Sequence, residues 1–255
     1  KSRIEFEGIL SKNPSVKEMT DSINKMAEEL ENTEVLRSDF VNNFSHEFKT
    51  PIVSISGFAK LLKTENITEE QRREYLDIIE EESRRLSAMA TNVLNLTKVE
   101  NQTILTDVSS FNLSEQIRTC VLILEDKWTA KQIDLQLDFD EICVVGSEEL
   151  LRQVWLNLLD NAIKFTPCGG TVFIRIRQDE KSISVDVANT GSSISSKDGE
   201  RIFAKFYQCD TSHSTQGNGV GLAVVKRIVD LHSGIVFVES KNDMTTFTVM
   251  LPKIK

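Results

Sequence analysis

A stripe of apolar residues recurs at helical spacing through the first sixty residues of the chain. Its first part comprises Met19, Ile23, Met26, Leu30, Leu36, Phe40 and Phe44. Steps of three, four and six hold these side chains on one face of a long helix. The stripe continues on both sides of Pro51 with Phe48, Ile52, Ile55, Phe58, Leu61 and Leu62. Because a proline inside a helix removes a backbone hydrogen bond and bends the axis, the sequence predicts one long helix with a kink at Pro51.

A second amphipathic helix is predicted from Thr68 to about Val99. The polar run TENITEEQ interrupts the first stripe, and Thr68 and Gln71 have the three-residue spacing of a capping box. The apolar face of this helix comprises Leu76, Ile79, Leu86, Met89, Val93 and Leu96. A hairpin of two helices cannot bury both stripes by itself, whereas two copies can bury them in a four-helix bundle, so we expect a homodimer.

The character of the sequence changes in the middle of the chain. Only Gly8 and Gly57 are glycines before Lys98, whereas short β-branched runs, glycines and turn residues follow Thr106. This change predicts a helical module followed by an α+β module. The 255 residues and their hydrophobic fraction of 40% suffice for one large domain or two ordinary ones.

Composition argues against several classes of protein. The formal net charge of −9 and the pI near 5.0 argue against a nucleic-acid partner, because no basic patch stands out to neutralise phosphates. The four cysteines and three histidines are scattered, which predicts neither a disulfide framework nor a zinc site. No apolar run reaches the roughly 18 residues that a membrane span needs. Because the chain begins with Lys1 rather than Met, we expect a fragment of a longer protein.

The stretch NFSHEFKTP, residues 43–51, places polar side chains beside the predicted kink. Phe44 and Phe48 belong to the apolar stripe, and His46 lies about 200° round the helix from each, so we expect it to face solvent. Taken alone, this stretch fits an ordinary surface or core histidine equally well. An exposed histidine on a rigid helix is nevertheless the placement that a nucleophile requires.

The second module begins with an amphipathic helix in SEELLRQVWLNLLDNAIKFTP, with Leu150, Leu151, Val154, Leu158 and Ile163 on its inner face. Asn157 and Asn161 are four residues apart and share another face, and Lys164 follows three residues later. Asparagine is mildly unfavourable inside helices. A pair of asparagines followed by lysine therefore indicates polar ligands for a metal-bound phosphate.

The remaining segments read as two β-hairpins with a glycine-rich loop between them. The first hairpin is GGTVFIRIRQ with KSISVDVANTG, and the second is GIVFVES with TTFTVMLP. Between them, ERIFAKFYQ places Phe203 and Phe206 on a short helix. The loop with Gly217, Gly219 and Gly221 runs directly into a helix, where backbone N–H groups and the helix N-terminus favour phosphate. A loop without such a role is the alternative interpretation.

Five ordered motifs resemble those of the sensor histidine kinases of two-component systems. They are FSHEFKTPIVSISGFAKLL, NLLDNAIKFT, ANTGSSIS, IFAKFYQ and GNGVGLAVVKRIVDLHSG. The resemblance covers about residues 34–252, and INKMAEEL upstream resembles the last helix of a HAMP signal-relay domain. It implies a HAMP remnant at 1–34, a dimerisation and histidine phosphotransfer domain at 35–105, and an ATP-binding catalytic domain at 106–255. The implied fold is a helical hairpin forming a dimeric four-helix bundle, followed by an α/β sandwich.

The resemblance also implies roles for individual residues. His46 is similar to the phospho-accepting histidine, Glu47 to its general base, and Thr50 to the position linked to phosphatase activity. The nucleotide-binding positions are Asn157, Asn161, Lys164, Asn189, Gly191, Phe203, Phe206, Gly217, Gly219, Gly221 and Leu222, with Asn157 and Asn161 as the Mg²⁺ ligands. The family implies ATP and Mg²⁺, a response regulator receiver domain as partner, and a location as the cytoplasmic portion of a cell-membrane protein.

Two positions depart from the family pattern. Asn189 stands where the family usually has an aspartate that accepts a hydrogen bond from the adenine amino group, and Ser193 stands where it usually has glycine. Three interpretations remain open: a working kinase with weaker ATP binding, which we favour, a changed nucleotide preference, or a degenerate site. An alternative function is a signalling scaffold that dephosphorylates a response regulator through Thr50 and uses ATP poorly. A hydrolytic ATPase is disfavoured, because related ATPases carry a water-activating glutamate at the position of Asn157.

Overall fold

The structure is a computed structural model that divides into two compact units, residues 1–83 and 84–255. It describes residues 14–64, 67–195, 198–199, 201–205, 207 and 219–253, with the side chains of residues 14, 29–44 and 46 left out. Among these residues, no helix is both long and apolar enough to cross a membrane.

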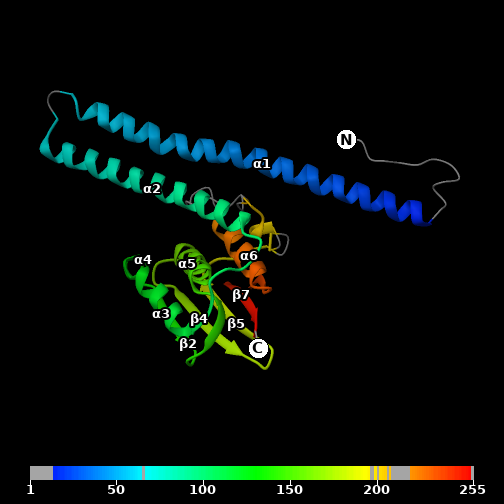
Figure 1. Ribbon diagram of the computed structural model, residues 1–255. Helices are drawn as coiled ribbons and strands as arrows, with labels where there is room; N and C mark the ends of the chain where they lie inside the picture. Colours follow the sequence, from blue (N-terminus) through cyan, green and yellow to red (C-terminus); the bar gives the residue numbers. More distant parts are fainter. Residues whose placement is uncertain are drawn as a thin grey trace. The chain divides into compact units, whose positions relative to one another are not determined.

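The first unit contains the long helix α1 (Pro14–Leu61) and the beginning of α2 (Glu69–Asn101), which Figure 1 shows as the two arms of a hairpin. Helix α1 continues through Pro51, as predicted. The predicted capping box is confirmed, because Thr68 Oγ1 accepts from the Gln71 backbone N–H at 3.1 Å and Gln71 Oε1 accepts from the Thr68 N–H at 3.0 Å. Near this turn the rings of Phe58 and Tyr75 lie 5.3 Å apart and join the two arms.

The second unit is built on a five-stranded sheet with the strand order β2-β4-β5-β7-β6. Its strands are β2 (Asp134–Asp138), β4 (Thr171–Gln178), β5 (Ser182–Thr190), β7 (Met244–Pro252) and β6 (Ile235–Lys241). Strand β2 pairs parallel with β4, and all other pairs are antiparallel. The two predicted hairpins are therefore confirmed as β4–β5 and β6–β7.

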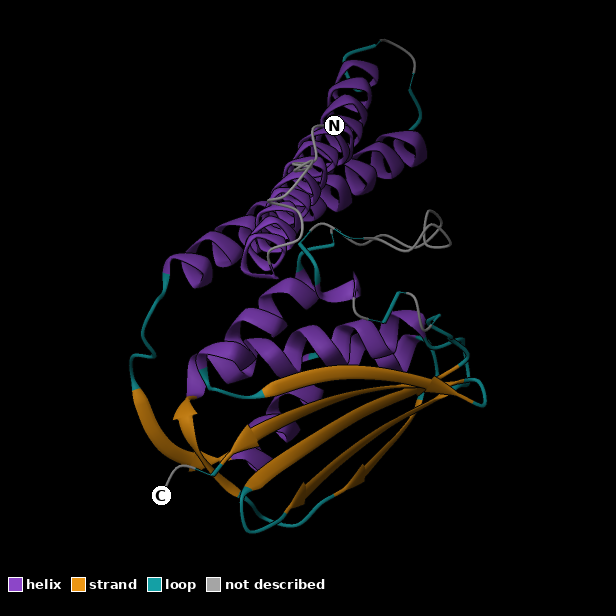
Figure 2. Cartoon of the chain, turned by 90° about the vertical axis from the view of Figure 1, so that its right-hand side faces the viewer, coloured by secondary structure: helices purple, strands orange, loops and turns teal. Residues whose placement is uncertain are grey.

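Helices cover one face of this sheet, as Figure 2 shows. They are α3 (Leu113–Ile123), α5 (Glu148–Phe165) and α6 (Gly221–Leu231), with the short α4 (Glu125–Ala130) after α3. A separate two-stranded sheet pairs β1 (Val108–Asn112) with β3 (Cys143–Ser147). The alternate residues Ile183, Val185 and Val187 of β5 are buried, as expected for a sheet with one covered face. The predicted α/β sandwich is confirmed, whereas the elements between residues 108 and 147 were not foreseen.

The core of the second unit extends into the last turns of α2. Leu96 and Val99 are 4% and 1% exposed and belong to the same buried cluster as the inner face of α5. Two polar contacts lie beside them: Lys205 pairs with Glu100 at 2.6 Å, and Arg227 donates to the Gln102 carbonyl at 2.6 Å. The end of α2 is thus part of the second unit.

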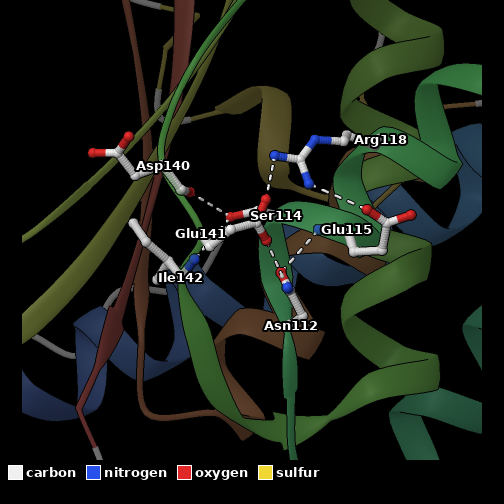
Figure 3. Close-up of polar contacts among 7 residues, drawn as sticks. All are labelled: Asn112, Ser114, Glu115, Arg118, Asp140, Glu141 and Ile142. Atoms are coloured by element: carbon white, nitrogen blue, oxygen red, sulfur yellow. Dashed lines mark hydrogen bonds and ion pairs between the residues drawn. The ribbon is translucent and has the colours of Figure 1, made fainter.

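A polar network fastens the start of α3 to the chain that enters β3 (Figure 3). Asn112 caps α3 by accepting from the Glu115 N–H at 3.0 Å, and its own amide donates to Glu141 at 2.6 Å. Arg118 pairs with Glu141 at 2.6 Å and lowers the pKa of that carboxyl group. The ion pair is exposed, so we expect the helix cap to contribute more to stability than the charges do.

The buried Ser114 completes this network from the apolar side. Its hydroxyl donates to the Asp140 carbonyl at 2.7 Å and accepts from the Ile142 N–H at 3.0 Å. The loop before β3 therefore keeps its backbone groups paired where it passes under α3.

His232 connects the end of α6 to the start of α5. Its Nε2 accepts from the Ser147 N–H at 3.0 Å, and its Nδ1 lies 2.8 Å from the Ile228 carbonyl. Because Ser147 supplies a donor and Ile228 an acceptor, the ring must be neutral with its proton on Nδ1. Burial lowers the pKa of His232 below its ordinary value of 6.5.

We predict that the second unit loses stability in mild acid because of His232. A folded-state pKa below the unfolded value means that protonation favours the unfolded chain, so this contribution is complete above about pH 7 and falls as the pH drops through 6.5. Urea unfolding of the wild type and His232→Gln at pH 8 and pH 5.5 measures it. The glutamine amide keeps a neutral acceptor, so the variant should lose less stability between the two pH values, and an equal loss would contradict the assignment.

Candidate functional site

Helix α5 presents one apolar and one polar face, as its sequence predicts. Leu151 and Leu158 are fully buried, whereas Asn157, Asn161 and Lys164 are half-buried. The helix begins with Ser147 at its N-cap and carries Glu148 and Glu149 in its first turn, where acidic side chains suit the helix dipole. Packing of the apolar face fixes the direction in which the two asparagines and the lysine point.

The structure brings Asn157 against the first residue of α6. The Asn157 amide nitrogen donates to the Gln153 carbonyl at 2.8 Å. A Cβ atom added to Gly221 would lie 2.7 Å from Asn157 Oδ1, so any larger residue would have to displace the Asn157 amide. Two predicted site residues that are far apart in sequence therefore meet, and the amide oxygen of one faces the backbone of the other.

The N-terminus of α6 adds positive potential at this contact. Among the residues that the structure describes, no side chain caps its first backbone N–H groups, and the preceding Gly219 has a φ of +60°. Uncapped N–H groups at a helix start attract anions, phosphate above all. Leu222 is half-buried in the same turn.

A cavity of about 340 Å³ opens beside this contact, within the second unit. Its lining includes Asn157, Asp160 and Gly221, together with Asn92 and Asn95 from the end of α2. The lining contains amide groups as well as apolar side chains. The cavity therefore offers polar groups beside Asn157 and Gly221.

Lys131 caps the C-terminal end of α5. Its ammonium group donates to the carbonyls of Ile163, Lys164 and Thr166 at 2.9, 2.7 and 3.0 Å. A cation at a helix C-terminus satisfies carbonyls that have no partner within the helix and complements its dipole. Lys131 thereby fixes the turn that carries Lys164. The sequence analysis missed this residue, because its three acceptors are backbone atoms that no side-chain pattern marks.

The turn after β5 holds Asn189 and Gly191. Asn189 is only 2% exposed, and its amide nitrogen donates to the Ser192 hydroxyl at 2.8 Å. Gly191 has a φ of +79°, and a Cβ atom there would lie 2.5 Å from Pro167 Cδ, so the turn requires glycine. Ser193 is exposed and is not among the described residues with positive φ, so its side chain adds no backbone strain.

The other predicted site residues are less fully described. Phe203 ends the short 3₁₀ helix η2 (Arg201–Phe203), and its ring packs edge-on to Phe247 at 6.3 Å. Glu47 is half-buried and Thr50 is exposed on α1 in the first unit. Phe206, Gly217 and the side chain of His46 lie outside the described residues, although the backbone of His46 is helical.

Two family models match the chain in the order of its two modules. Residues 36–102 match the His Kinase A (phospho-acceptor) domain, and residues 146–255 match the histidine kinase-, DNA gyrase B- and HSP90-like ATPase. The first match contains the predicted phospho-acceptor position, and the second contains the polar face of α5 and the start of α6.

Curated relatives and solved structures agree with these matches. The chain is 34% identical over 233 residues to the heme sensor protein HssS of Staphylococcus saprophyticus and 33% identical over 231 residues to that of Staphylococcus aureus. Each match covers 90% of this chain and 50% of the relative, so the chain spans about half the length of these proteins.

Histidine kinase ThkA in complex with response regulator protein TrrA has a TM-score of 0.71 and 26% identity, over 90% of this chain and 66% of that one. The catalytic domain of ThkA alone has a TM-score of 0.53 and 30% identity, over 58% of this chain and 97% of that one. The chain belongs to the sensor histidine kinases and represents their kinase region. Its second module is an ATP-binding domain of the histidine kinase, gyrase and HSP90 type.

We predict that Gly221→Ala separates nucleotide binding from folding. The new methyl group would meet Asn157 Oδ1 at 2.7 Å and displace that amide, whereas alanine is the better helix former by up to about 1 kcal/mol. ATP affinity should fall at least tenfold while the thermal midpoint stays within a few degrees of the wild type. Gly57→Ala, where the added Cβ meets nothing within 4 Å, is the control and should bind ATP normally. Unchanged ATP affinity in Gly221→Ala would contradict the assigned contact.

Proposed function

We propose that the chain is the kinase region of an ATP-dependent protein-histidine kinase, which phosphorylates His46 and passes the phosphoryl group to an aspartate of a response regulator. The contact between Asn157 on α5 and Gly221 at the start of α6 carries this proposal. It places an amide oxygen beside uncapped backbone N–H groups and a polar cavity. Such a set of groups suits a metal-bound polyphosphate.

The residues on α5 fit MgATP. Magnesium prefers oxygen ligands, and the amide oxygens of Asn157 and Asn161 are of this kind. Lys164 supplies positive charge on the same helix, where Lys131 holds the last turn. The bound ion would neutralise part of the phosphate charge. Because the side chain of Asn157 is an amide, it cannot take a proton from water, so we expect slow hydrolysis by water and transfer to His46 instead.

The proposed transfer uses His46 as nucleophile and Glu47 as base. A neutral imidazole nitrogen forms a bond to the γ-phosphorus while the bond to the β–γ bridging oxygen breaks, and ADP leaves with the electron pair. The proton of the other ring nitrogen moves to the Glu47 carboxylate, which is adjacent in sequence. We propose that the nucleotide is surrounded by the remaining site residues, which are Asn189, Gly191, Phe203, Phe206, Gly217, Gly219 and Leu222.

The proposed partners follow from the helical unit and from the relatives. Apolar residues of the two arms are exposed in the single chain, among them Met19, Met26, Ile52, Leu61 and Leu76. A second copy would cover them, which supports a homodimer. ThkA forms a complex with a response regulator, and we propose a receiver domain as the partner of this chain also. The domain boundaries near residues 34 and 105 and the link to a membrane-bound parent remain predictions.

A second candidate function is a response regulator phosphatase that uses ATP poorly and acts through Thr50. The asparagine at position 189 favours it, because an amide makes a weaker hydrogen bond to adenine than a carboxylate does. Incubation with γ-labelled ATP separates the candidates. An acid-labile label on the protein supports the kinase, no label with regulator dephosphorylation supports the phosphatase, and released phosphate alone indicates a hydrolytic ATPase.

We predict that His46→Gln abolishes the acid-labile label while ATP binding, measured by calorimetry, stays within twofold of the wild type. The variant removes the proposed nucleophile in the first unit and leaves α5 and α6 unchanged. His232→Gln is the matched control and should still be labelled, because His232 is buried against Ser147 and Ile228. A label that persists in His46→Gln would refute the role of His46.

We predict that Asn161→Ala removes most of the Mg²⁺-dependent affinity for ATP. A lost oxygen ligand should cost at least tenfold, because Mg²⁺ demands a nearly regular octahedral set of ligands. Titrations with Mg²⁺ and with EDTA isolate the metal-dependent part. Arg152→Ala on the same helix is the control, since Arg152 is exposed and contacts Glu148. Equal metal dependence in Asn161→Ala and the wild type would show that Asn161 is not a ligand.

A further inference from the structure

We propose that Lys131 is a positioning residue of the nucleotide site, which holds the last turn of α5 so that Lys164 meets the phosphates of ATP. The inference rests on the proposed function, because it assumes that Lys164 contacts these phosphates. Lys131 directly follows α4 and lies outside every motif that the sequence analysis singled out. It acts on the nucleotide through the backbone of α5.

The chain leaves α5 in a way that deprives the helix end of donors. Pro167 has no N–H group to offer the Ile163 carbonyl four residues before it. Thr166 is engaged one residue further back, because its N–H and its hydroxyl donate to the Ala162 carbonyl at 3.0 and 2.6 Å. The ammonium group of Lys131 supplies the missing donor to Ile163, at 2.9 Å.

The same ammonium group holds Lys164 at its own backbone. Its contact with the Lys164 carbonyl is the shortest of the three, at 2.7 Å, and its contact with the Thr166 carbonyl is 3.0 Å. Thr166 is 1% exposed, so its carbonyl would reach water only if the turn moved. Without the ammonium group we therefore expect the last turn of α5 to shift toward solvent and to carry the Lys164 side chain with it.

The backbone of Lys131 is itself held at the end of α4. The Gln132 N–H donates to the Thr129 carbonyl at 2.9 Å, and the Ile133 N–H donates to the Trp128 carbonyl at 3.0 Å. These two bonds form a Schellman motif, in which Gln132 has the positive φ, +53°. The Trp128 indole N–H in turn donates to a carbonyl of α3 at 3.1 Å. The ammonium group thus extends from a fixed point toward the end of α5.

The loop after α5 is held independently of the Lys131 side chain. The Gly169 N–H donates to the Lys131 carbonyl at 2.9 Å, and the Gly170 N–H donates to the Pro167 carbonyl at 3.0 Å. The Asp134 N–H donates to the Gly170 carbonyl at 2.9 Å and joins this loop to β2. All three are backbone bonds, which a change of side chain leaves in place. Substitution of Lys131 therefore acts on the last turn of α5.

The first test measures ATP binding by calorimetry, with Mg²⁺, in the wild type and Lys131→Met, which keeps the aliphatic stem and removes the ammonium group. We expect ATP affinity to fall about tenfold, which is the size of one hydrogen bond. Lys181→Met is the matched control and should bind ATP within twofold of the wild type. Lys181 is exposed in the turn between β4 and β5, at the end of β5 away from Gly191. Urea unfolding verifies that each variant is folded at the temperature of the titration.

The second test is a double-mutant cycle, which separates positioning from a purely structural role. If Lys131 acts through Lys164, then Lys131→Met should lower ATP affinity less than twofold in the Lys164→Met background. Lys131→Gln, which removes the charge but keeps two donors, replaces Lys131→Met should that variant fail to fold, and its loss should likewise vanish in this background.

Two results would overturn the inference while leaving ATP binding established. One is an unchanged ATP affinity in Lys131→Met, and the other is an equal fall in the wild-type and Lys164→Met backgrounds. A wild type that binds no ATP would overturn the proposed function and the inference with it.

Discussion

The burial of one face of α5 is the constraint on which the second unit depends. This helix packs between the sheet, α3 and α6, and its Trp155 is 1% exposed with its indole N–H donating to the Gln116 side chain at 2.9 Å. Because packing fixes the apolar face in this way, it also fixes the direction in which the polar face of α5 points. The carbonyl contacts of Lys131 then fix the last turn, so the helix is held along its length and at its end. A site that neutralises phosphate needs this rigidity, because positioning is the main contribution a protein makes to phosphoryl transfer.

Periodicity in the sequence was sufficient for the long helices and the hairpins. The stripes of α1 and α5 extend over many turns, and the hairpins β4–β5 and β6–β7 join segments that are neighbours in the chain. The strands between Val108 and Ser147 were missed for the opposite reason. Strand β2 pairs parallel with β4 across the whole of α5, and β1 pairs with β3 across α3 and α4. Pairings of this length leave no local pattern in segments of five residues.

The candidate site could be predicted where a side chain acts directly and not where it acts through another group. Asn157 and Gly221 stand in recognisable motifs, and the structure brings them together. Lys131 escaped notice, because its importance depends on contacts with backbone carbonyls. The structure also explains why serine is accommodated at position 193. The turn requires glycine at position 191, where φ is positive, and not at position 193.

The inclusion of Leu96 and Val99 in the core of the second unit has a consequence for dissecting the molecule. Burying each of these side chains is worth about 1.5–3 kcal/mol, which together is a large share of the stability of an ordinary domain. A fragment that began in the linker at residue 106 would lack both, and it would also lose the partners of Lys205 and Arg227. The smallest piece that keeps this core whole starts inside a helix, a turn or more before Leu96, and its first residues come from the arm of the hairpin.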